Sequence, residues 1–470
     1  MKSVIFIAIA FGFSLQSSAQ QSREWTLTEC IEYALAHNLN IKQQEDNVRQ
    51  QEITLSTSRN SRLPDLNGSI GENFSFGRAL TVDNTYQNRN TQSTSFSLGT
   101  SIPLITGGRL PAQVKVNRLN LQAALQDYEH ARENVMLSVT SAYLEAIYQK
   151  DLVAVAERQV ELSQAQVRRM ELLFQNDKAS EAELSQIRST LANDELSLTQ
   201  QRNSYMLALL ELSQLLELDT PEGFDVARPL EVTLPLNGAG DQGTAGQGEV
   251  LPLKGAGGSL NGAGDQGTGG SLPEGIYNEA LGIKPQILAE QTRLQSAEKS
   301  VLVAKSALYP SLHFNAGIGT SYYNTSGYAT TGFGPQLRDN FNQYFGVSLS
   351  IPIFNRLSTR NSIRSARLQV HAQQVRLDQA KKSLYKEIQQ AYYNAVAASR
   401  QCESSDAALA SAQTAFELMQ RKYENGKATG TDFQDAKTRY LRAESQQIQS
   451  RYTYLFRQKI LDFYRGQPLQ

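Results

Sequence analysis

At residues 423–440 the chain reads Tyr-Glu-Asn-Gly-Lys-Ala-Thr-Gly-Thr-Asp-Phe-Gln-Asp-Ala-Lys-Thr-Arg-Tyr, a tight turn between two long, strongly helical runs. A related turn occurs at residues 174–188, which read Phe-Gln-Asn-Asp-Lys-Ala-Ser-Glu-Ala-Glu-Leu-Ser-Gln-Ile-Arg. Phe174 precedes Tyr423 by 249 residues, and the other matched positions of the two turns keep this spacing. Self-similarity at a fixed spacing is the signature of an internal repeat. The sequence therefore predicts a duplicated helical hairpin.

The N-terminus has the form of a secretory signal. Lys2 is followed by an apolar run at 4–15 and then by Ser17, Ser18 and Ala19. This order predicts a signal peptide at 1–19 with cleavage after Ala19. No later stretch reaches the ~18 apolar residues that a transmembrane helix needs. A mature chain that spans a membrane must therefore do so with β-strands.

The first half of the chain predicts a structural repeat over residues 20–218. Within it, Ile70, Phe74 and Phe76 alternate with polar residues at a period of two, although Glu72 interrupts the apolar face. Later apolar residues recur at spacings of three, four and seven, which is typical of long packed helices. The predicted elements are a helix at 26–62 with Thr28 as its N-cap, strands at 66–76 and 94–104, and antiparallel helices at 110–176 and 181–218.

Residues 274–466 predict a second repeat with the same order of elements. Pro64 corresponds to Pro310, and Pro103 corresponds to Pro352, so matching prolines border the two strand pairs. The predicted elements are a helix, strands at 311–323 and 341–353, and a long helical hairpin. Each predicted strand has about ten residues, which agrees with the ~9–11 residues of a tilted strand that crosses a bilayer.

A glycine-rich segment, residues 219–273, separates the two repeats. Thirteen of the 32 glycines fall at 238–270, and the sequence of 237–244 recurs without change at 261–268. This composition is unable to bury a core, so the segment is predicted to be a flexible linker.

The number of strands predicts an assembly of several chains. Four strands are too few to close a membrane barrel, whose smallest bacterial examples have about eight. Unpaired strand edges are unfavourable in lipid, because each bare backbone N–H or C=O there costs several kcal/mol. Two copies would provide about eight strands and a filled interior, whereas three would provide about twelve and a wider lumen.

The whole pattern resembles the TolC-family outer-membrane efflux proteins. The residues that carry the resemblance are Thr28-Glu-Cys-Ile-Glu-Tyr-Ala-Leu-Ala-His-Asn38, the paired strand–proline junctions and both hairpin turns. The resemblance implies an α+β membrane protein in which a long antiparallel α-helical coiled-coil barrel continues into a transmembrane β-barrel. That β-barrel would be shared by three protomers with four strands each, and the fold would be built from an internal duplication.

The resemblance also implies functional residues at the two turns. It places Asp432 and Asp435 at the pore constriction of the periplasmic end. It places Tyr423 and Glu183 in the link between helices that holds the closed state together. The arginine that joins this link in family members is replaced here by Ala428.

Local helix chemistry provides a second interpretation of these acidic residues. Ser180 and Glu183 have the Ser-x-x-Glu form of a capping box, and Thr429 and Asp432 occupy the matching positions. A capping role would explain why residue 432 is acidic even if Asp432 has no role in a pore. Asp435 has no such role, although Arg439 four residues later would allow a surface ion pair.

No catalytic or cofactor chemistry is predicted. The four histidines lack the spacing of metal ligands and are His37, His130, His313 and His371. Cys30 and Cys402 lie in separate helical runs and are predicted to be free thiols. The net charge of −1 provides no basis for nucleic-acid binding.

The sequence and the resemblance together predict an exit duct in the cell outer membrane with its helical part in the periplasm. The duct would belong to a tripartite efflux or type I secretion system and would conduct substrates passively from periplasm to exterior. The implied partners are two further copies, a periplasmic adaptor protein, an inner-membrane pump or ABC exporter, and outer-membrane lipid. The alternative is a secreted periplasmic coiled-coil scaffold without a pore.

Overall fold

The computed structural model describes residues 23–80, 84–220, 223–228, 272–327 and 329–467. The predicted signal peptide and residues 229–271 of the predicted linker lie outside the described residues. The chain divides into two compact units, each assembled from segments of both repeats. The first unit comprises Met1–Leu39, Glu133–Gly275 and Ile388–Gln470, and the second comprises Asn40–Arg132 and Ile276–Glu387.

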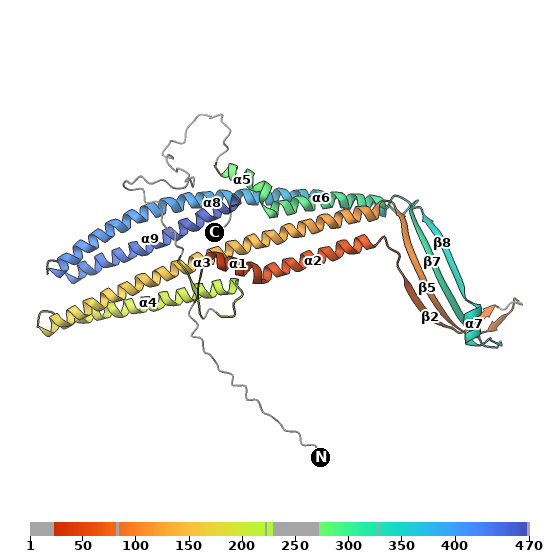
Figure 1. Ribbon diagram of the computed structural model, residues 1–470, viewed down its shortest axis with the longest axis horizontal. Helices are drawn as coiled ribbons and strands as arrows, with labels where there is room; N and C mark the ends of the chain where they lie inside the picture. The colour runs from red at the N-terminus through yellow and green to blue at the C-terminus, as the bar shows by residue number, and fades with distance from the viewer. Residues whose placement is uncertain (1–22, 81–83, 221–222, 229–271, 328, 468–470) are drawn as a thin grey trace, which may run out of the picture. The chain divides into compact units, whose positions relative to one another are not determined.

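The second unit contains a four-stranded antiparallel sheet (Figure 1). Its strands, in the order in which they pair, are β2 (Asn67–Ser75), β5 (Thr91–Thr106), β7 (Ser311–Thr325) and β8 (Asn342–Ser350). The central pair, β5 and β7, comes from different repeats and remains in register over most of its length. Long-range pairing therefore joins the two halves of the sequence in one sheet.

At one end of the sheet each strand is joined to a helix that precedes or follows it in the chain. These helices are α2 (Leu39–Asn60) before β2, α3 (Arg109–Gln175) after β5, α6 (Pro285–Ser306) before β7 and α8 (Ser358–Glu424) after β8. At the opposite strand ends the connections within each strand pair contain short elements, namely the hairpin of β3 (Arg78–Leu80) and β4 (Tyr86–Asn88), and α7 (Phe333–Asp339).

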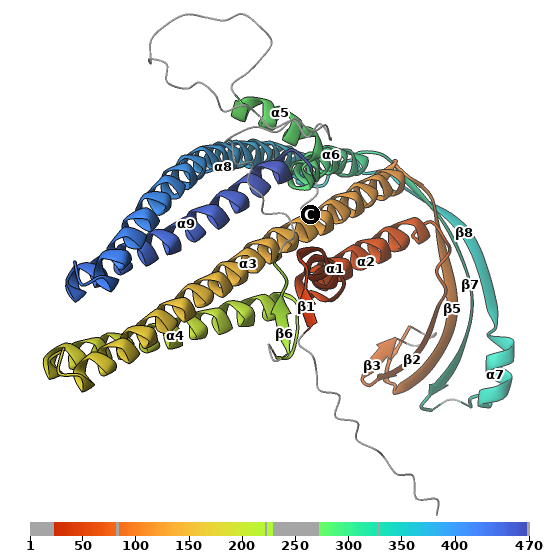
Figure 2. The same cartoon turned by 60° about the vertical axis from the view of Figure 1, so that its left-hand side comes forward.

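The first unit contains the two helical tips. The C-terminal part of α3 forms a hairpin with α4 (Glu181–Leu215), and the C-terminal part of α8 forms one with α9 (Gly430–Tyr464) (Figure 2). Both long helices have 67 residues, and both returning helices have 35. The equal lengths reflect the duplication, because each helix ends at the matched turn of its repeat.

A two-stranded parallel sheet in this unit includes residues that were predicted to belong to the flexible linker. Residues of β6 (Phe224–Val226) pair in parallel with β1 (Arg23–Trp25), and Phe224 and Val226 are buried. Tyr143 of α3 donates hydrogen bonds to the carbonyls of Trp25, at 3.1 Å, and Ala227, at 2.7 Å. The linker prediction was wrong at its start because three strand residues carry too little pattern to be recognised. At its end the predicted linker overlaps α5 (Leu272–Ile283) by two residues.

The first predicted helix is interrupted, and its N-cap lies two residues before the predicted one. The chain forms α1 (Leu27–His37) and then α2, with Asn38 between them in a non-helical conformation. Asn38 is buried and donates to the Leu215 carbonyl at 3.2 Å. The N-cap is Thr26 rather than Thr28, because the Thr26 hydroxyl accepts from the Glu29 amide in a complete capping box.

Candidate functional site

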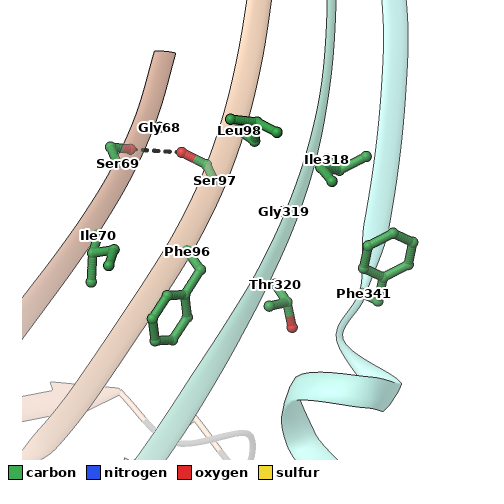
Figure 3. Close-up of a pocket in the computed structure, with 10 residues that line it drawn as sticks. All are labelled: Gly68, Ser69, Ile70, Phe96, Ser97, Leu98, Ile318, Gly319, Thr320 and Phe341. Atoms are coloured by element: carbon green, nitrogen blue, oxygen red, sulfur yellow. Dashed lines mark hydrogen bonds between the residues drawn. The ribbon is translucent and has the colours of Figure 1, made fainter. Parts of the chain in front are cut away.

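One face of the four-stranded sheet is apolar and exposed. Residues paired across strands share a face, and the register pairs Ile70 with Phe96 and Leu98 with Ile318. Figure 3 shows these four side chains across three neighbouring strands, around a hollow of about 480 Å³. The exposed fraction is 76% for Ile70 and reaches 85% for Phe345 on β8. An exposed apolar surface of this kind marks contact with lipid or with another protein.

The other face carries small and polar side chains. Ser69 and Ser97 are paired on it, with their hydroxyl oxygens 2.6 Å apart. Gly317 is paired with Tyr344, and a Cβ added to Gly317 would lie 2.8 Å from the Tyr344 ring and from the Leu98 carbonyl oxygen. Glycine at this position therefore allows the tyrosine to lie flat over the strand. A sheet with one apolar and one polar face is what a wall between lipid and water requires.

Glu72 lies on the apolar face, where the sequence places it. Its carboxylate accepts hydrogen bonds from the Gln92 amide at 2.8 Å and from the Thr94 hydroxyl on the adjacent strand. These bonds satisfy the carboxylate locally, which lowers the penalty for a charge on this face.

At the helical tips, Asp432 and Glu183 complete capping boxes. The Asp432 carboxylate accepts from the Thr429 hydroxyl at 2.7 Å and from the Thr429 amide at 3.2 Å. The Glu183 carboxylate accepts the equivalent bonds from Ser180. These hydrogen bonds hold the pKa of both carboxyl groups below the ordinary value. Both acids are therefore charged near neutral pH, and each has a structural role.

Asp435 has a different environment from Asp432. Its carboxylate lies 2.8 Å from the Arg439 guanidinium, one helical turn further along α9, and both side chains are largely exposed. An exposed pair of this kind contributes little to stability, about 0.3–0.5 kcal/mol. The carboxylate consequently remains accessible to solvent and to ions.

Tyr423 contacts two elements besides its own helix. Its ring stacks on Phe433 of α9, with centroids 4.9 Å apart. The guanidinium of Arg169 on α3 lies 4.9 Å from the Tyr423 ring centroid and donates to the carbonyl oxygens of Tyr423 and Glu424. The sequence did not predict Arg169. Among the described residues no hydrogen bond joins Tyr423 to Glu183, whose carboxylate bonds to Ser180.

A buried ion pair connects the two helical hairpins. Lys437 of α9 is fully buried, and its Nζ lies 3.1 Å from Asp194 Oδ2 on α4. Ser163 and Gln159 of α3 also bond to this pair. Burial lowers the pKa of Lys437, and the Asp194 carboxylate opposes that shift. The pair was missed, although Lys437 lies between the buried Phe433 and Leu441 at helical spacing, which is the signal that would have revealed it.

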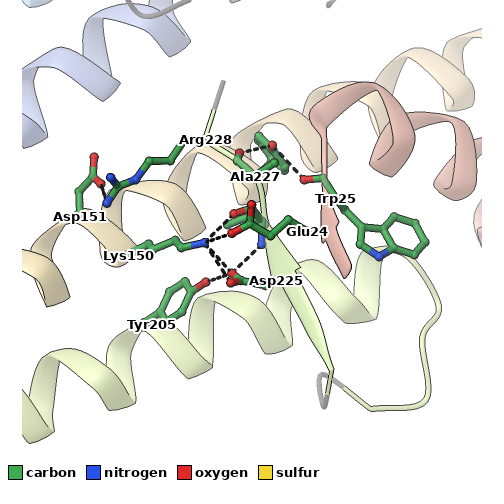
Figure 4. A network of polar contacts seen from close by, with 10 residues as sticks. Glu24, Trp25, Lys150, Asp151, Tyr205, Asp225, Ala227 and Arg228 are labelled. Atoms are coloured by element: carbon green, nitrogen blue, oxygen red, sulfur yellow. Dashed lines mark hydrogen bonds and ion pairs between the residues drawn. The ribbon is translucent and has the colours of Figure 1, made fainter. Parts of the chain in front are cut away.

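A second polar cluster fixes the β1–β6 ribbon (Figure 4). Lys150 of α3 contacts the Asp225 carboxylate at 3.0 Å, the Glu24 carboxylate at 3.2 Å and the Val226 carbonyl at 2.8 Å. Partial burial raises the pKa of Asp225, but hydrogen bonds from Tyr205, Lys150 and the Val226 amide outweigh it and lower that pKa. The cluster satisfies every charge it contains, so it is structural.

Within the described ranges no helix is long and apolar enough to cross a membrane. The same ranges contain no group of three or more His, Cys, Asp or Glu residues placed to hold a metal ion. Cys30 and Cys402 are both free and buried, as predicted. Burial raises the pKa of the Cys30 thiol to about 12, so this thiol is unreactive at neutral pH.

Duplicated long helical hairpins and a two-faced antiparallel sheet place the chain in the class of outer-membrane proteins that combine a helical and a β-stranded part. The chain belongs to the outer membrane efflux protein family, whose pattern matches residues 30–217 and 276–467. The predicted family and the predicted outer-membrane location are thereby confirmed.

Known proteins similar to this chain agree with that assignment. The pyoverdine export outer membrane protein OpmQ of Pseudomonas putida is 23% identical over 72% of this chain and 62% of its own length. The outer membrane protein TolC of Escherichia coli is 26% identical over 36% of this chain and 35% of its own length. These matches span less than two thirds of either relative.

The fold extends over almost the whole chain. The solved CmeC outer membrane channel of Campylobacter jejuni is 19% identical and superimposes with a TM-score of 0.71. The superposition covers 94% of this chain and 85% of that one. The predicted fold class is thereby confirmed.

Proposed function

We propose that this protein is the outer-membrane exit duct of a tripartite efflux or type I secretion system and conducts substrates passively. The observation that carries the proposal is the sheet, which has an exposed apolar face and a polar face and whose edge strands β2 and β8 each pair on one side in the described structure. Bare edges are not tolerated in lipid, so other copies of the sheet must supply their partners.

A trimer fits this requirement. With four strands from each of three copies, the closed wall would have twelve strands, and its polar faces would line a lumen wide enough for water. The polar face supports this interpretation, because glycine and serine leave space on the side opposite the apolar residues. The periplasmic scaffold considered above would have no need of an exposed apolar sheet.

The transport energy would come from partners. Family membership supports an adaptor protein and an inner-membrane pump or ABC exporter as the other components. The Pseudomonas putida relative is named for pyoverdine export. The chain is proposed to have no catalytic step of its own.

Asp432 and Asp435 are proposed to form the constriction at the periplasmic tip. Both carboxylates are exposed and lie one helical turn apart, so three copies would place six charges around one opening. Such a ring attracts cations, most strongly multivalent ones.

Tyr423 and Glu183 are proposed to stabilise the closed tip. Tyr423 would do so by stacking on Phe433 and by contact with the Arg169 guanidinium. Arg169 would thereby supply the positive charge that the family's arginine, replaced here by Ala428, does not provide. Glu183 would do so by fixing the start of α4 through its capping box. Arg169→Gln should therefore raise the open probability of the channel. An unchanged open probability would show that the contact between Arg169 and Tyr423 does not hold the tip closed.

The constriction is tested by single-channel recording in planar bilayers. Replacement of both Asp432 and Asp435 by Ala should weaken block by multivalent cations applied from the periplasmic side. Asp378→Ala is the matched control, because Asp378 is an exposed acid on α8 away from the tip. Block that is equally strong in the double variant and the control would exclude the two aspartates from the pore.

A further inference from the structure

The four junctions between strand and helix lie at one end of the sheet. Ser311, the first residue of β7, pairs with Thr106 at the end of β5 and with Ser350 at the end of β8. Asn67, the first residue of β2, pairs with Gly99 in the same half of β5. The ends of α2 and α6 and the starts of α3 and α8 therefore meet the sheet at this same end.

These junctions are strongly basic. Segments 56–66, 107–120, 296–310 and 354–368 together contain eleven Lys and Arg residues and two acidic residues. We call these eleven cations the basic belt. The loops at the opposite end of the sheet, 76–90 and 326–341, contain three Lys and Arg residues and two acidic ones. Since the whole chain has a net charge of −1, the belt is a local concentration of positive charge.

The side chains of the belt form no ion pair within the part of the chain that the structure describes. Among the described residues, no hydrogen bond or ion pair engages the side chain of any of the eleven cations. One of the two acids, Asp65, is engaged elsewhere, since its carboxylate accepts from the Ser101 amide and from Asn67. Lys115, Lys299 and Lys305 line one cleft, where unpaired like charges repel one another, so an external anion would stabilise them.

Part of the belt surrounds a cleft between α3 and α6. The cleft has a volume of about 310 Å³, and three lysines line it, Lys115 from α3 and Lys299 and Lys305 from α6. Leu302 and Tyr309 add apolar surface to the same cleft. Lys115 is exposed, and the other two lysines are half-buried.

The floor of the cleft is fixed by a close backbone approach. Gly107 has a φ of +58°, and a Cβ there would lie 2.6 Å from the Ser306 carbonyl oxygen and 2.7 Å from Tyr309 Cβ. Glycine thus lets the turn that starts α3 lie against the end of α6. Pro111 and Ala112 from the first turn of α3 also line the cleft, and the dipole at a helix N-terminus favours an anion.

We propose that this cleft binds the phosphate headgroup of an anionic phospholipid in the periplasmic leaflet of the outer membrane. The inference rests on the proposed membrane position of the sheet, since that position puts the belt at the leaflet surface. Three lysines supply the charge, while Leu302 and Tyr309 face the region where headgroup meets acyl chain. Basic clefts between helix ends at a membrane surface are suited to such headgroups.

The test uses the full-length protein in nanodiscs made of equal parts phosphatidylethanolamine and phosphatidylglycerol. Native mass spectrometry counts the phosphatidylglycerol molecules that each protomer retains on stepwise activation. The variant is Lys115→Gln/Lys299→Gln/Lys305→Gln, and the control is Lys42→Gln/Lys382→Gln/Lys386→Gln, which removes the same charge from exposed lysines elsewhere. We expect retention of phosphatidylglycerol to fall at least about tenfold in the variant and to be unchanged in the control.

Three further outcomes are decisive. Equal loss in variant and control, or no loss in either, would overturn the cleft as a site. Displacement of the lipid by inorganic phosphate at equal concentration would assign the site to free phosphate instead. Single-channel conductance of the same preparations separates this inference from the proposed function, because a conducting protein with no lipid preference overturns the lipid site alone.

Discussion

Replacement of Lys437 by Met should destabilise the helical hairpins strongly. The Lys437 side chain is 0% exposed, that of Asp194 is 8% exposed, and their charged atoms are 3.1 Å apart. At an effective dielectric constant of about 20, two unit charges at this distance attract by about 5 kcal/mol. The desolvation of both ions opposes this attraction by several kcal/mol each, so the intact pair contributes little net stability.

Removal of one partner changes that balance. In Lys437→Met the Asp194 carboxylate remains buried without its cation, although Gln159 and Ser163 still donate to it. We therefore expect a loss of about 3–5 kcal/mol. The double variant Lys437→Met/Asp194→Leu removes both charges, and we expect it to recover most of the loss.

Native-state hydrogen exchange of the α4 and α9 amides provides the assay, because it reports the free energy of local opening in the assembled protein. Arg202→Met is the control. Arg202 of α4 pairs with Glu157, and the two side chains are 61% and 49% exposed, so its loss should cost below about 1 kcal/mol. A loss below about 1 kcal/mol for Lys437→Met, or a double variant no more stable than Lys437→Met, would show that burial does not make this pair costly to break.

Three further predictions concern the tips and the sheet. Asp435→Asn alone should weaken multivalent-cation block measured in planar bilayers, because its carboxylate is free of a capping role, and unchanged block would assign the constriction to Asp432. Gly317→Val should reduce the yield of heat-resistant oligomer on gels, since its side chain would collide with the Tyr344 ring 2.8 Å from the new Cβ; an unchanged yield would contradict the packing. Acid should loosen both tips, because the pKa of Asp432 and of Glu183 is lowered in the fold. The stabilisation by these two carboxylates is complete above their ordinary pKa values, 3.8 for Asp432 and 4.5 for Glu183, and is lost as pH falls through their lowered pKa values. The rate of hydrogen exchange at the tips, corrected for the intrinsic rate, should therefore rise only in this acidic range.

The periodic elements were predictable from the sequence. Period-two alternation located the four long strands to within a few residues, and the matched turns located the ends of the long helices. The parity of the alternation also predicted which residues share a face. Each of these patterns extends over many residues, so a single residue that departs from the pattern does not change the prediction.

The features that escaped prediction depend on long-range contacts. The β1–β6 ribbon has three residues in each strand and is held by Tyr143 and Lys150 from a distant helix. The interruption at Asn38 depends on the Leu215 carbonyl. Arg169 was missed for the same reason, because its partner Tyr423 belongs to the other repeat.

The candidate constriction was identified through resemblance, and the structure separates its members. Asp432 and Glu183 were recognisable as capping residues, because a capping box is a local pattern. Asp435 carries only a surface pair with Arg439, and its proposed role at the pore depends on copies of the chain that a single sequence does not specify. Local chemistry is therefore predictable here, whereas the arrangement of three chains around an axis is not.

Three copies of this chain are proposed to close one water-filled channel in the outer membrane. Single-channel recording of the purified protein in a planar bilayer, after its mass has been measured in detergent, tests this assembly. We expect a trimeric mass and discrete conductance steps that multivalent cations block from the periplasmic side. A monomeric protein that leaves the membrane without detergent and carries no current would contradict it.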